Sequence, residues 1–96
     1  MSRLRWNEEK NAKLKAERGI GFEQIVRHIE SGDVVKVFKH PNPRYPRQWV
    51  MVVDVEGYAY YVPYVPETEY DFLKTIIPSR KATRDYLGAQ HEDDQA

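Results

Sequence analysis

The chain of 96 residues has no cysteine, which excludes disulfides and thiolate metal sites and is compatible with a reducing compartment. It also has no net charge, because 15 Lys and Arg residues balance 15 Asp and Glu residues. The chain therefore lacks the overall positive field that draws a protein to nucleic acid or to an anionic membrane, and any phosphate-binding surface must be local. No apolar run approaches the roughly 20 residues of a membrane span.

Several signals of catalytic or secreted proteins are missing as well. The N-terminal residues lack the apolar stretch of a secretory signal, so we expect a soluble cytoplasmic protein with no membrane contact. The histidines His28, His40 and His91 lie far apart, and no carboxylates stand at ligand spacing beside them. There is no glycine-rich phosphate loop and no support for a nucleophilic triad. We therefore expect no metal site and no cofactor.

Two helices are indicated near the N-terminus. Asn7 is a suitable N-cap for a charged helix over residues 8–18, and Gly19 suits its C-terminal end. A second helix follows after Gly21, with Ile20 and Ile25 at the positions of a hydrophobic staple. It ends before Ser31-Gly32 and presents one apolar face made by Phe22, Ile25, Val26 and Ile29. This helix is expected to pack on a sheet.

The rest of the chain is mainly β-structure. Strand composition predicts strands at 34–38, 48–55, 58–65 and 70–77, and residues 3–6 could add an edge strand. Pro63 should interrupt the third of the four, and Ser79 should cap a short helix over 80–87. Short turns imply an antiparallel four-stranded sheet with the helices on one face, in a single α+β domain over 1–88 followed by a polar tail at 89–96.

Positive side chains gather in two places. Lys36, Lys39, His40, Arg44 and Arg47 form the densest stretch, and the last three of them stand on a loop, 40–47, that three prolines stiffen. Lys74, Arg80, Lys81 and Arg84 form the other. Arg80 and Lys81 stand at the amide-rich start of a helix, which repels cations but attracts phosphate. Each cluster is either a phosphate-binding surface or a solvated charged face.

Tyrosines gather on two neighbouring strands. They are Tyr58, Tyr60, Tyr61, Tyr64 and Tyr70, and alternation places Tyr61 on the face opposite to Tyr58, Tyr60 and Tyr64. A bulge at Pro63 would change that parity for the residues after it. Tyrosines on a sheet can stack on unpaired bases, or they can cover the sheet and form a protein interface.

Three motifs in this order resemble the BrnT toxin family of bacterial type II toxin–antitoxin systems. They are Trp6-Asn-Glu-Glu-Lys-Asn-Ala-Lys-Leu14, Arg18-Gly-Ile-Gly-Phe-Glu-Gln-Ile25 and Ile76-Ile-Pro-Ser-Arg-Lys-Ala-Thr-Arg-Asp-Tyr86. The resemblance implies a RelE-like ribonuclease fold and a ribbon-helix-helix antitoxin that forms a hetero-oligomer with the toxin. The chain departs from the family at Thr75, where an arginine is frequent, and at Arg18, where a histidine is frequent.

The function expected from this resemblance is RNA cleavage without metal, which inhibits translation and growth. In such a reaction a ribose 2′-OH attacks the adjacent phosphate, and this needs a base, an acid and cations. We assign Arg80 and Lys81 to charge stabilisation with Lys74 as a third cation, and His40, with Tyr61 second, to proton transfer, because imidazole changes charge near neutral pH. Arg44, Arg47 and Arg84 are further candidates for binding RNA phosphate.

The alternative is a non-catalytic module that binds protein or nucleic acid, such as an inactive toxin homologue. The lack of arginine at Thr75 favours this alternative. The two hypotheses differ in what they require of the structure, since cleavage needs the cations of residues 40–47 and 74–84 to converge on one cleft.

Overall fold

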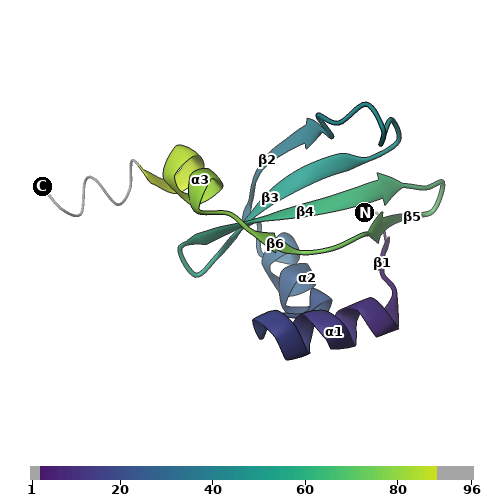
Figure 1. Cartoon of the computed structure of the whole chain (residues 1–96), viewed down its shortest axis with the longest axis horizontal. Coiled ribbons are helices and arrows are strands. Elements are labelled where there is room, and N and C mark those ends of the chain that lie inside the picture. The colour runs from purple at the N-terminus through teal and green to yellow at the C-terminus, as the bar shows by residue number, and fades with distance from the viewer. Residues whose placement is uncertain (1–2, 89–96) are drawn as a thin grey trace, which may run out of the picture.

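The computed structural model describes residues 3–88, in which a sheet lies between helices. Figure 1 shows α1 and α2 together below the sheet and α3 apart from them at the left. The elements are β1 (Arg3–Arg5), α1 (Glu8–Arg18), α2 (Phe22–Glu30), β2 (Val34–Lys39), β3 (Trp49–Val55), β4 (Tyr58–Pro66), β5 (Tyr70–Leu73), β6 (Ile77–Pro78), α3 (Arg80–Ala82) and the π-helix η1 (Thr83–Leu87). The fold class is therefore α+β, as the sequence predicts.

The helix ends are formed by the residues that the sequence indicates. The Asn7 side chain accepts a hydrogen bond from the Lys10 N–H at 2.9 Å and begins α1. Gly19 ends that helix with φ of 71°, a left-handed conformation that glycine adopts without strain. The Ser79 Oγ accepts from the Ala82 N–H at 2.9 Å and begins α3. These three cap predictions are confirmed.

The sheet differs from the predicted four antiparallel strands. Within residues 3–88 it has six strands in the order β1-β5-β4-β3-β2, with β6 also paired to β4. All pairs are antiparallel except β1–β5, which is parallel, so the sheet is mixed. The predicted strand at 70–77 is divided into β5 and β6. In the gap between them the Arg18 guanidinium donates to the Ile76 carbonyl, which satisfies an acceptor that a continuous strand would have paired.

Pro63 does not interrupt β4, contrary to the prediction. The pairing of β4 with β3 continues through Val50–Pro63 and Trp49–Tyr64 without a bulge. The Pro63 carbonyl accepts from the Lys74 N–H at 2.8 Å, on the side where the last predicted strand is divided into β5 and β6. In an antiparallel sheet the N–H and C=O of one residue point to the same neighbouring strand. Pro63 therefore lacks its N–H on the side of the break between β5 and β6, where no regular ladder requires a donor.

The two faces of the sheet are covered unequally. The face that α1 and α2 cover, here called the helix face, carries the larger core, including Phe22, Ile25, Val53, Leu73 and Ile76. The opposite face, here called the open face, carries a smaller core in which Ala82 and Leu87 of the C-terminal helix pack on Val52 and Ala59. Helices therefore cover both faces, and the prediction that all lie on one face is wrong.

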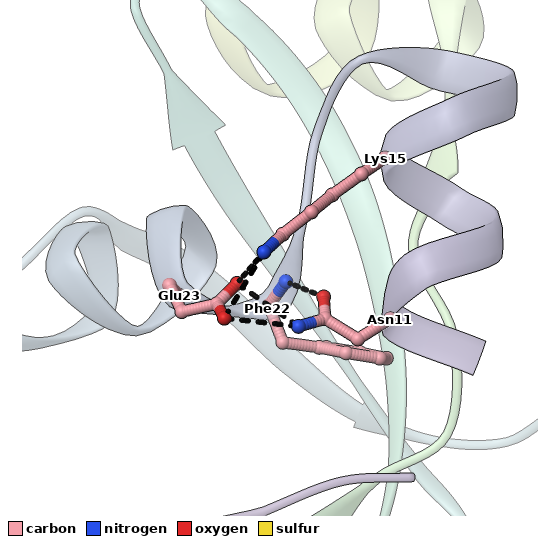
Figure 2. A network of polar contacts seen from close by, with 4 residues as sticks. All are labelled: Asn11, Lys15, Phe22 and Glu23. Carbon is pink, nitrogen blue, oxygen red and sulfur yellow. Dashed lines mark hydrogen bonds and ion pairs between the residues drawn. The ribbon is translucent and has the colours of Figure 1, made fainter. Parts of the chain in front are cut away.

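A polar network fixes the angle between α1 and α2 (Figure 2). Asn11, which is only 2% exposed, accepts a hydrogen bond from the Phe22 N–H at 2.8 Å and donates to both Glu23 carboxylate oxygens at 3.0 Å. Lys15 pairs with the same carboxylate at 3.2 Å. A Cβ on Gly21 would lie 2.5 Å from the Lys15 Cε and 2.8 Å from the Asn11 Oδ1, so the network also requires glycine there.

The C-terminal helix is less regular than predicted. Residues 80–87 form one α-helical turn, α3, which continues directly as the π-helix η1. No helix within residues 3–88 is long and apolar enough to cross a membrane. The predicted polar tail at 89–96 lies outside the described residues.

Candidate nucleic-acid interface

The open face leaves part of its sheet uncovered beyond the C-terminal helix. This uncovered part holds a pocket of about 230 Å³ lined by Phe38, His40, Pro41, Val50, Tyr61, Pro63 and Ile77. The lining is mainly apolar, with the imidazole of His40 and the phenol of Tyr61 as its polar side chains. Two of the predicted catalytic residues therefore line one pocket, although they are 21 positions apart in the sequence.

The loop between β2 and β3 positions His40 by several short-range hydrogen bonds. The His40 N–H donates to the Gln48 carbonyl at 3.0 Å, and its Nδ1 accepts from the Asn42 N–H at 3.1 Å. The ring also lies 4.9 Å from the Tyr45 ring, centroid to centroid. Because Nδ1 accepts a hydrogen bond, neutral His40 carries its proton on Nε2. The neutral ring therefore offers its Nε2–H as a hydrogen-bond donor, and it can act as an acid only after Nδ1 is protonated and the bond from Asn42 is lost.

Tyr61 connects the pocket to the C-terminal helix. Its ring meets Phe38 edge to face at 6.1 Å between centroids. Asp85 raises the pKa of Lys81 by a hydrogen bond and by its charge, and the nearby Tyr61 hydroxyl contributes to the same effect. The Lys81 Nζ lies 3.0 Å from the Asp85 carboxylate. Lys81 thus extends near Tyr61 but is already held by a carboxylate.

Lys74 lies on the open face, beside Phe72, an aromatic residue that the sequence alone did not indicate as a site residue. Leu73 points into the core of the helix face, so its neighbours Phe72 and Lys74 point to the open face. The Lys74 Nζ lies 5.4 Å from the centre of the Phe72 ring, and the Arg5 guanidinium lies 5.1 Å from the centre of the Tyr70 ring. These are cation–π distances. Cations and aromatic rings therefore alternate across β1 and β5.

Arg5 and Phe72 are functional candidates that the sequence analysis missed. A signal was present in the alternation of Arg3 with Arg5 and in that of Tyr70, Phe72 and Lys74. That signal has meaning only once β1 is known to pair with β5, which places Arg5 opposite Phe72.

The C-terminal helix carries Arg80, Lys81 and Arg84 on the open-face side of the sheet. Arg80 is exposed, and no ion pair within residues 3–88 includes it. Arg84 lies 3.5 Å from the Asp85 carboxylate. Because α3 is a single turn, the field of a long helix does not act on Arg80 and Lys81, and this part of the predicted anion site is not supported.

The two cation clusters do not converge completely. Strand register places the 40–48 loop at the Tyr64 end of β4, whereas Ser79 and Thr83 bond to Ala59 at its beginning. Figure 1 shows this loop far from α3. Arg47 lies 3.6 Å from Glu67 at the loop end, and the exposed Arg44 has a backbone N–H bonded to Asn42. Of the loop's predicted residues, the structure brings only His40 into the pocket.

The strand tyrosines lie on the predicted faces. Tyr60 and Tyr64 pack against the core of the helix face, and Tyr61 packs on the opposite side. Burial raises the pKa of Tyr64, and the charge of Asp71 adds to it. Tyr61 is therefore available to a ligand on the open face, together with Tyr70.

Within residues 3–88 no three His, Asp or Glu side chains come together in a way that could hold a metal ion. Comparison of the chain with protein-family models, with curated proteins and with solved structures finds no match in any of the three.

Proposed function

We propose that the protein is the toxin of a type II toxin–antitoxin pair, with a RelE-like fold, and that it cleaves RNA on its open face without a metal. The observation that carries this proposal is the pocket shared by His40 and Tyr61. Lys81 lies near Tyr61, and Lys74 lies on the same face of the sheet. An imidazole and a phenol thus line an apolar hollow on a face that also carries cations.

The surface suits single-stranded RNA more than a duplex. The pocket walls and the half-buried rings of Tyr61, Tyr70 and Phe72 offer apolar surface to unpaired bases, which stack on aromatic side chains. Lys74, Arg5 and Arg80 supply positive charge that is not neutralised by a carboxylate within the described residues. RNA phosphates therefore have partners beside the positions where bases would stack.

In the proposed reaction the 2′-oxygen forms a bond to the adjacent phosphorus while the bond from phosphorus to the 5′-oxygen breaks. The products are a 2′,3′-cyclic phosphate and a 5′-hydroxyl. His40, once protonated on Nδ1 to the imidazolium in place of its hydrogen bond from Asn42, donates its Nε2 proton to the leaving 5′-oxygen and returns to the neutral ring. Lys81 and Lys74 stabilise the negative charge on the phosphorane oxygens. Tyr61, as the phenolate with the Lys81 cation nearby, is the candidate to accept the 2′-proton and become the neutral phenol.

An antitoxin, expected to be of ribbon-helix-helix type, would keep the protein inactive by covering part of the open face. Exposed cations attract an acidic segment, and aromatic rings give it apolar anchors. The proposal places the protein in the bacterial cytoplasm, where its RNA substrates and its partner occur.

The decisive experiment uses the purified full chain and a labelled single-stranded RNA. We expect cleavage that persists in excess EDTA and leaves a cyclic phosphate end. Arg80→Ala combined with Lys74→Ala should abolish it, whereas Lys13→Ala, which removes a cation from α1, should not. Inducible expression should arrest growth, and co-expression of the neighbouring gene should relieve the arrest. Binding of RNA without cleavage by wild-type protein would contradict the catalytic proposal.

A second candidate function is a non-catalytic binding module. It is favoured by the carboxylates that already hold several predicted site cations, since Asp85 contacts Lys81 and Arg84, and Glu67 contacts Arg47. It is also favoured by the incomplete convergence of the two clusters. This module would bind RNA or a partner through the same open face but would cause no growth arrest.

A further inference from the structure

The helix face has a groove at the end of the sheet that α1 and α2 leave uncovered. Its volume is about 250 Å³, and it lies between the C-terminal end of α2 and strands β1, β2, β3 and β5. Its apolar walls are Leu4, Ile29, Val34, Val37 and Met51. This groove lies on the face opposite to the pocket of His40 and Tyr61, and the proposed function does not use it.

Two carboxylates, those of Asp71 and Glu30, stand at this groove. Asp71 is half-buried, and neither residue takes part in an ion pair within residues 3–88. Burial raises the pKa of Asp71, and among residues 3–88 no hydrogen bond or positive charge offsets that burial. A carboxylate that has lost water without gaining a partner is costly in the free protein, and a cation placed beside it removes that cost.

The groove opens toward the edge of the sheet. β2 is an outer strand of the order β1-β5-β4-β3-β2, and Val37, which forms one groove wall, is 44% exposed. Val35 on the same strand is 42% exposed. Apolar surface therefore continues from the groove to an edge strand that an incoming chain can reach.

We propose that this groove is a docking site for a protein segment that presents an aliphatic side chain next to an arginine or lysine. The aliphatic side chain fills the hollow between Leu4, Val37 and Met51. The cation pairs with Asp71 and, at the groove mouth, with Glu30. Charge complementarity selects this occupant, because an acidic or purely apolar segment would leave Asp71 without a partner.

The site does not depend on the proposed RNA cleavage. It attracts a basic segment, whereas the open face attracts phosphate or an acidic segment. The two faces can therefore be occupied at the same time, and a partner on the groove would leave RNA bound on the open face.

The test is an amide NMR titration of the full chain with small probes that carry the proposed chemistry. The probe is n-butylguanidinium, and n-pentanol and pentanoate are its neutral and anionic counterparts. We expect butylguanidinium to shift the amides of Leu4, Val37 and Asp71 with an affinity roughly five- to tenfold above that of pentanol, as expected for one partly screened ion pair. Pentanoate should bind more weakly than pentanol.

Asp71→Asn should remove the preference for butylguanidinium over pentanol while pentanol still binds. Glu69→Gln is the matched control, because it removes the same charge from an exposed residue outside the groove. A single-stranded RNA added at saturation should leave the butylguanidinium shifts unchanged, which separates this site from the open face whether or not the RNA is cleaved.

Three results would overturn the proposal. One is equal affinity for the three probes, which would make the groove a merely apolar hollow. Another is a set of shifts centred on the open face. The third is a concentration-dependent dimer, seen by sedimentation equilibrium and weakened by Val37→Glu, because the occupant would then be a second copy of this chain.

Discussion

The two faces of the sheet are made by the same strands but hold their helices in different ways. On the helix face, α1 and α2 bury a large apolar core and are joined by the Asn11–Glu23 network. On the open face, the C-terminal helix buries a core of four residues, Val52, Ala59, Ala82 and Leu87, and leaves the pocket beside them open. Stability is thus concentrated on one face, and the surface free for a ligand is concentrated on the other.

Two adjacent isoleucines give the strongest test of this comparison. Ile76 is fully buried in the core of the helix face, whereas Ile77 is 40% exposed and lines the pocket. We expect Ile76→Ala to lower the free energy of unfolding by about 2–5 kcal/mol, because it removes buried methylenes and leaves a cavity. Ile77→Ala should cost under about 1 kcal/mol but weaken RNA binding. Urea denaturation measures the first effect, and fluorescence anisotropy with labelled RNA measures the second.

The comparison would fail if the two substitutions destabilised the protein equally. That outcome would mean that the open face contributes as much to stability as the helix face.

Buried hydrogen bonds allow a second comparison between the faces. Asn11→Ala leaves the Phe22 N–H without its acceptor and Glu23 without its buried donor, so we expect a loss of about 1–3 kcal/mol. Thr83→Val removes the hydroxyl that accepts from the Ala59 N–H at 2.8 Å and donates to the Ser79 carbonyl at 2.8 Å. Its expected cost is about 1 kcal/mol, because this site is only partly buried. Thermal unfolding followed by circular dichroism can rank the two.

A larger loss for Thr83→Val than for Asn11→Ala would contradict this ranking. Asn11→Asp serves as a control, since it keeps the acceptor for Phe22 but places a second carboxylate beside Glu23. It should be more destabilising at neutral pH than at low pH.

Local sequence signals predicted the helices, their caps and the β3–β4 hairpin, because each depends on residues close together in the chain. The parallel β1–β5 pair and the division of the last strand could not be predicted in this way. β1 has three residues, and its partner lies 67 positions away at Arg3–Tyr70. The division between β5 and β6 involves Arg18, which reaches the Ile76 carbonyl from the end of α1. Both features depend on contacts that exist only after the sheet has formed.

The sequence predicted part of the candidate site, as it predicted part of the fold. His40 and Tyr61 were chosen by residue type, and the structure places them in one pocket. Arg44 and Arg47 were predicted to bind RNA phosphate because they belong to the same positive cluster of the sequence as His40. In the structure, Arg47 lies beside Glu67 instead. Phe72 and Arg5 were missed because their alignment depends on the β1–β5 register. Sequence proximity is a poor guide to a surface made from several strands.

A third prediction concerns positive charge on the two faces. Lys74→Ala and Arg80→Ala should each weaken single-stranded RNA binding and each lower the slope of log affinity against log salt by about 0.7 if one phosphate contact is lost. Lys13→Ala on α1 should change neither quantity beyond the general loss of one charge. Anisotropy titrations at several salt concentrations provide both numbers. Equal effects of all three substitutions would indicate nonspecific attraction rather than an interface on the open face.

The smallest expected effect concerns Glu23 and Asp85, two exposed carboxylates whose pKa values are lowered by different kinds of contact. Asn11 first, then a backbone N–H and Lys15, lower the pKa of Glu23, while Lys81 and Arg84 lower the pKa of Asp85 on the open face. A carboxyl group with a lower pKa in the folded state adds stability above its unfolded pKa, and this contribution is lost as pH falls through the folded pKa. Glu23→Gln should therefore flatten the decline of stability below about pH 4.5, and Asp85→Asn should flatten it below about pH 3.8, the ordinary pKa values of the two carboxyl groups.

Salt should distinguish the two carboxylates. The Asp85 contribution comes from exposed ion pairs and should shrink at about 1 M salt, where screening acts over roughly 3 Å. The Glu23 contribution comes first from hydrogen bonds donated by the buried Asn11 amide, so most of it should remain. Thermal melts from pH 3 to 6 at low and high salt, on both variants and the parent chain, measure the difference. If salt removed both contributions equally, Asn11 would not be the main support of the Glu23 carboxylate, and the polar network would hold α1 and α2 through Lys15 instead.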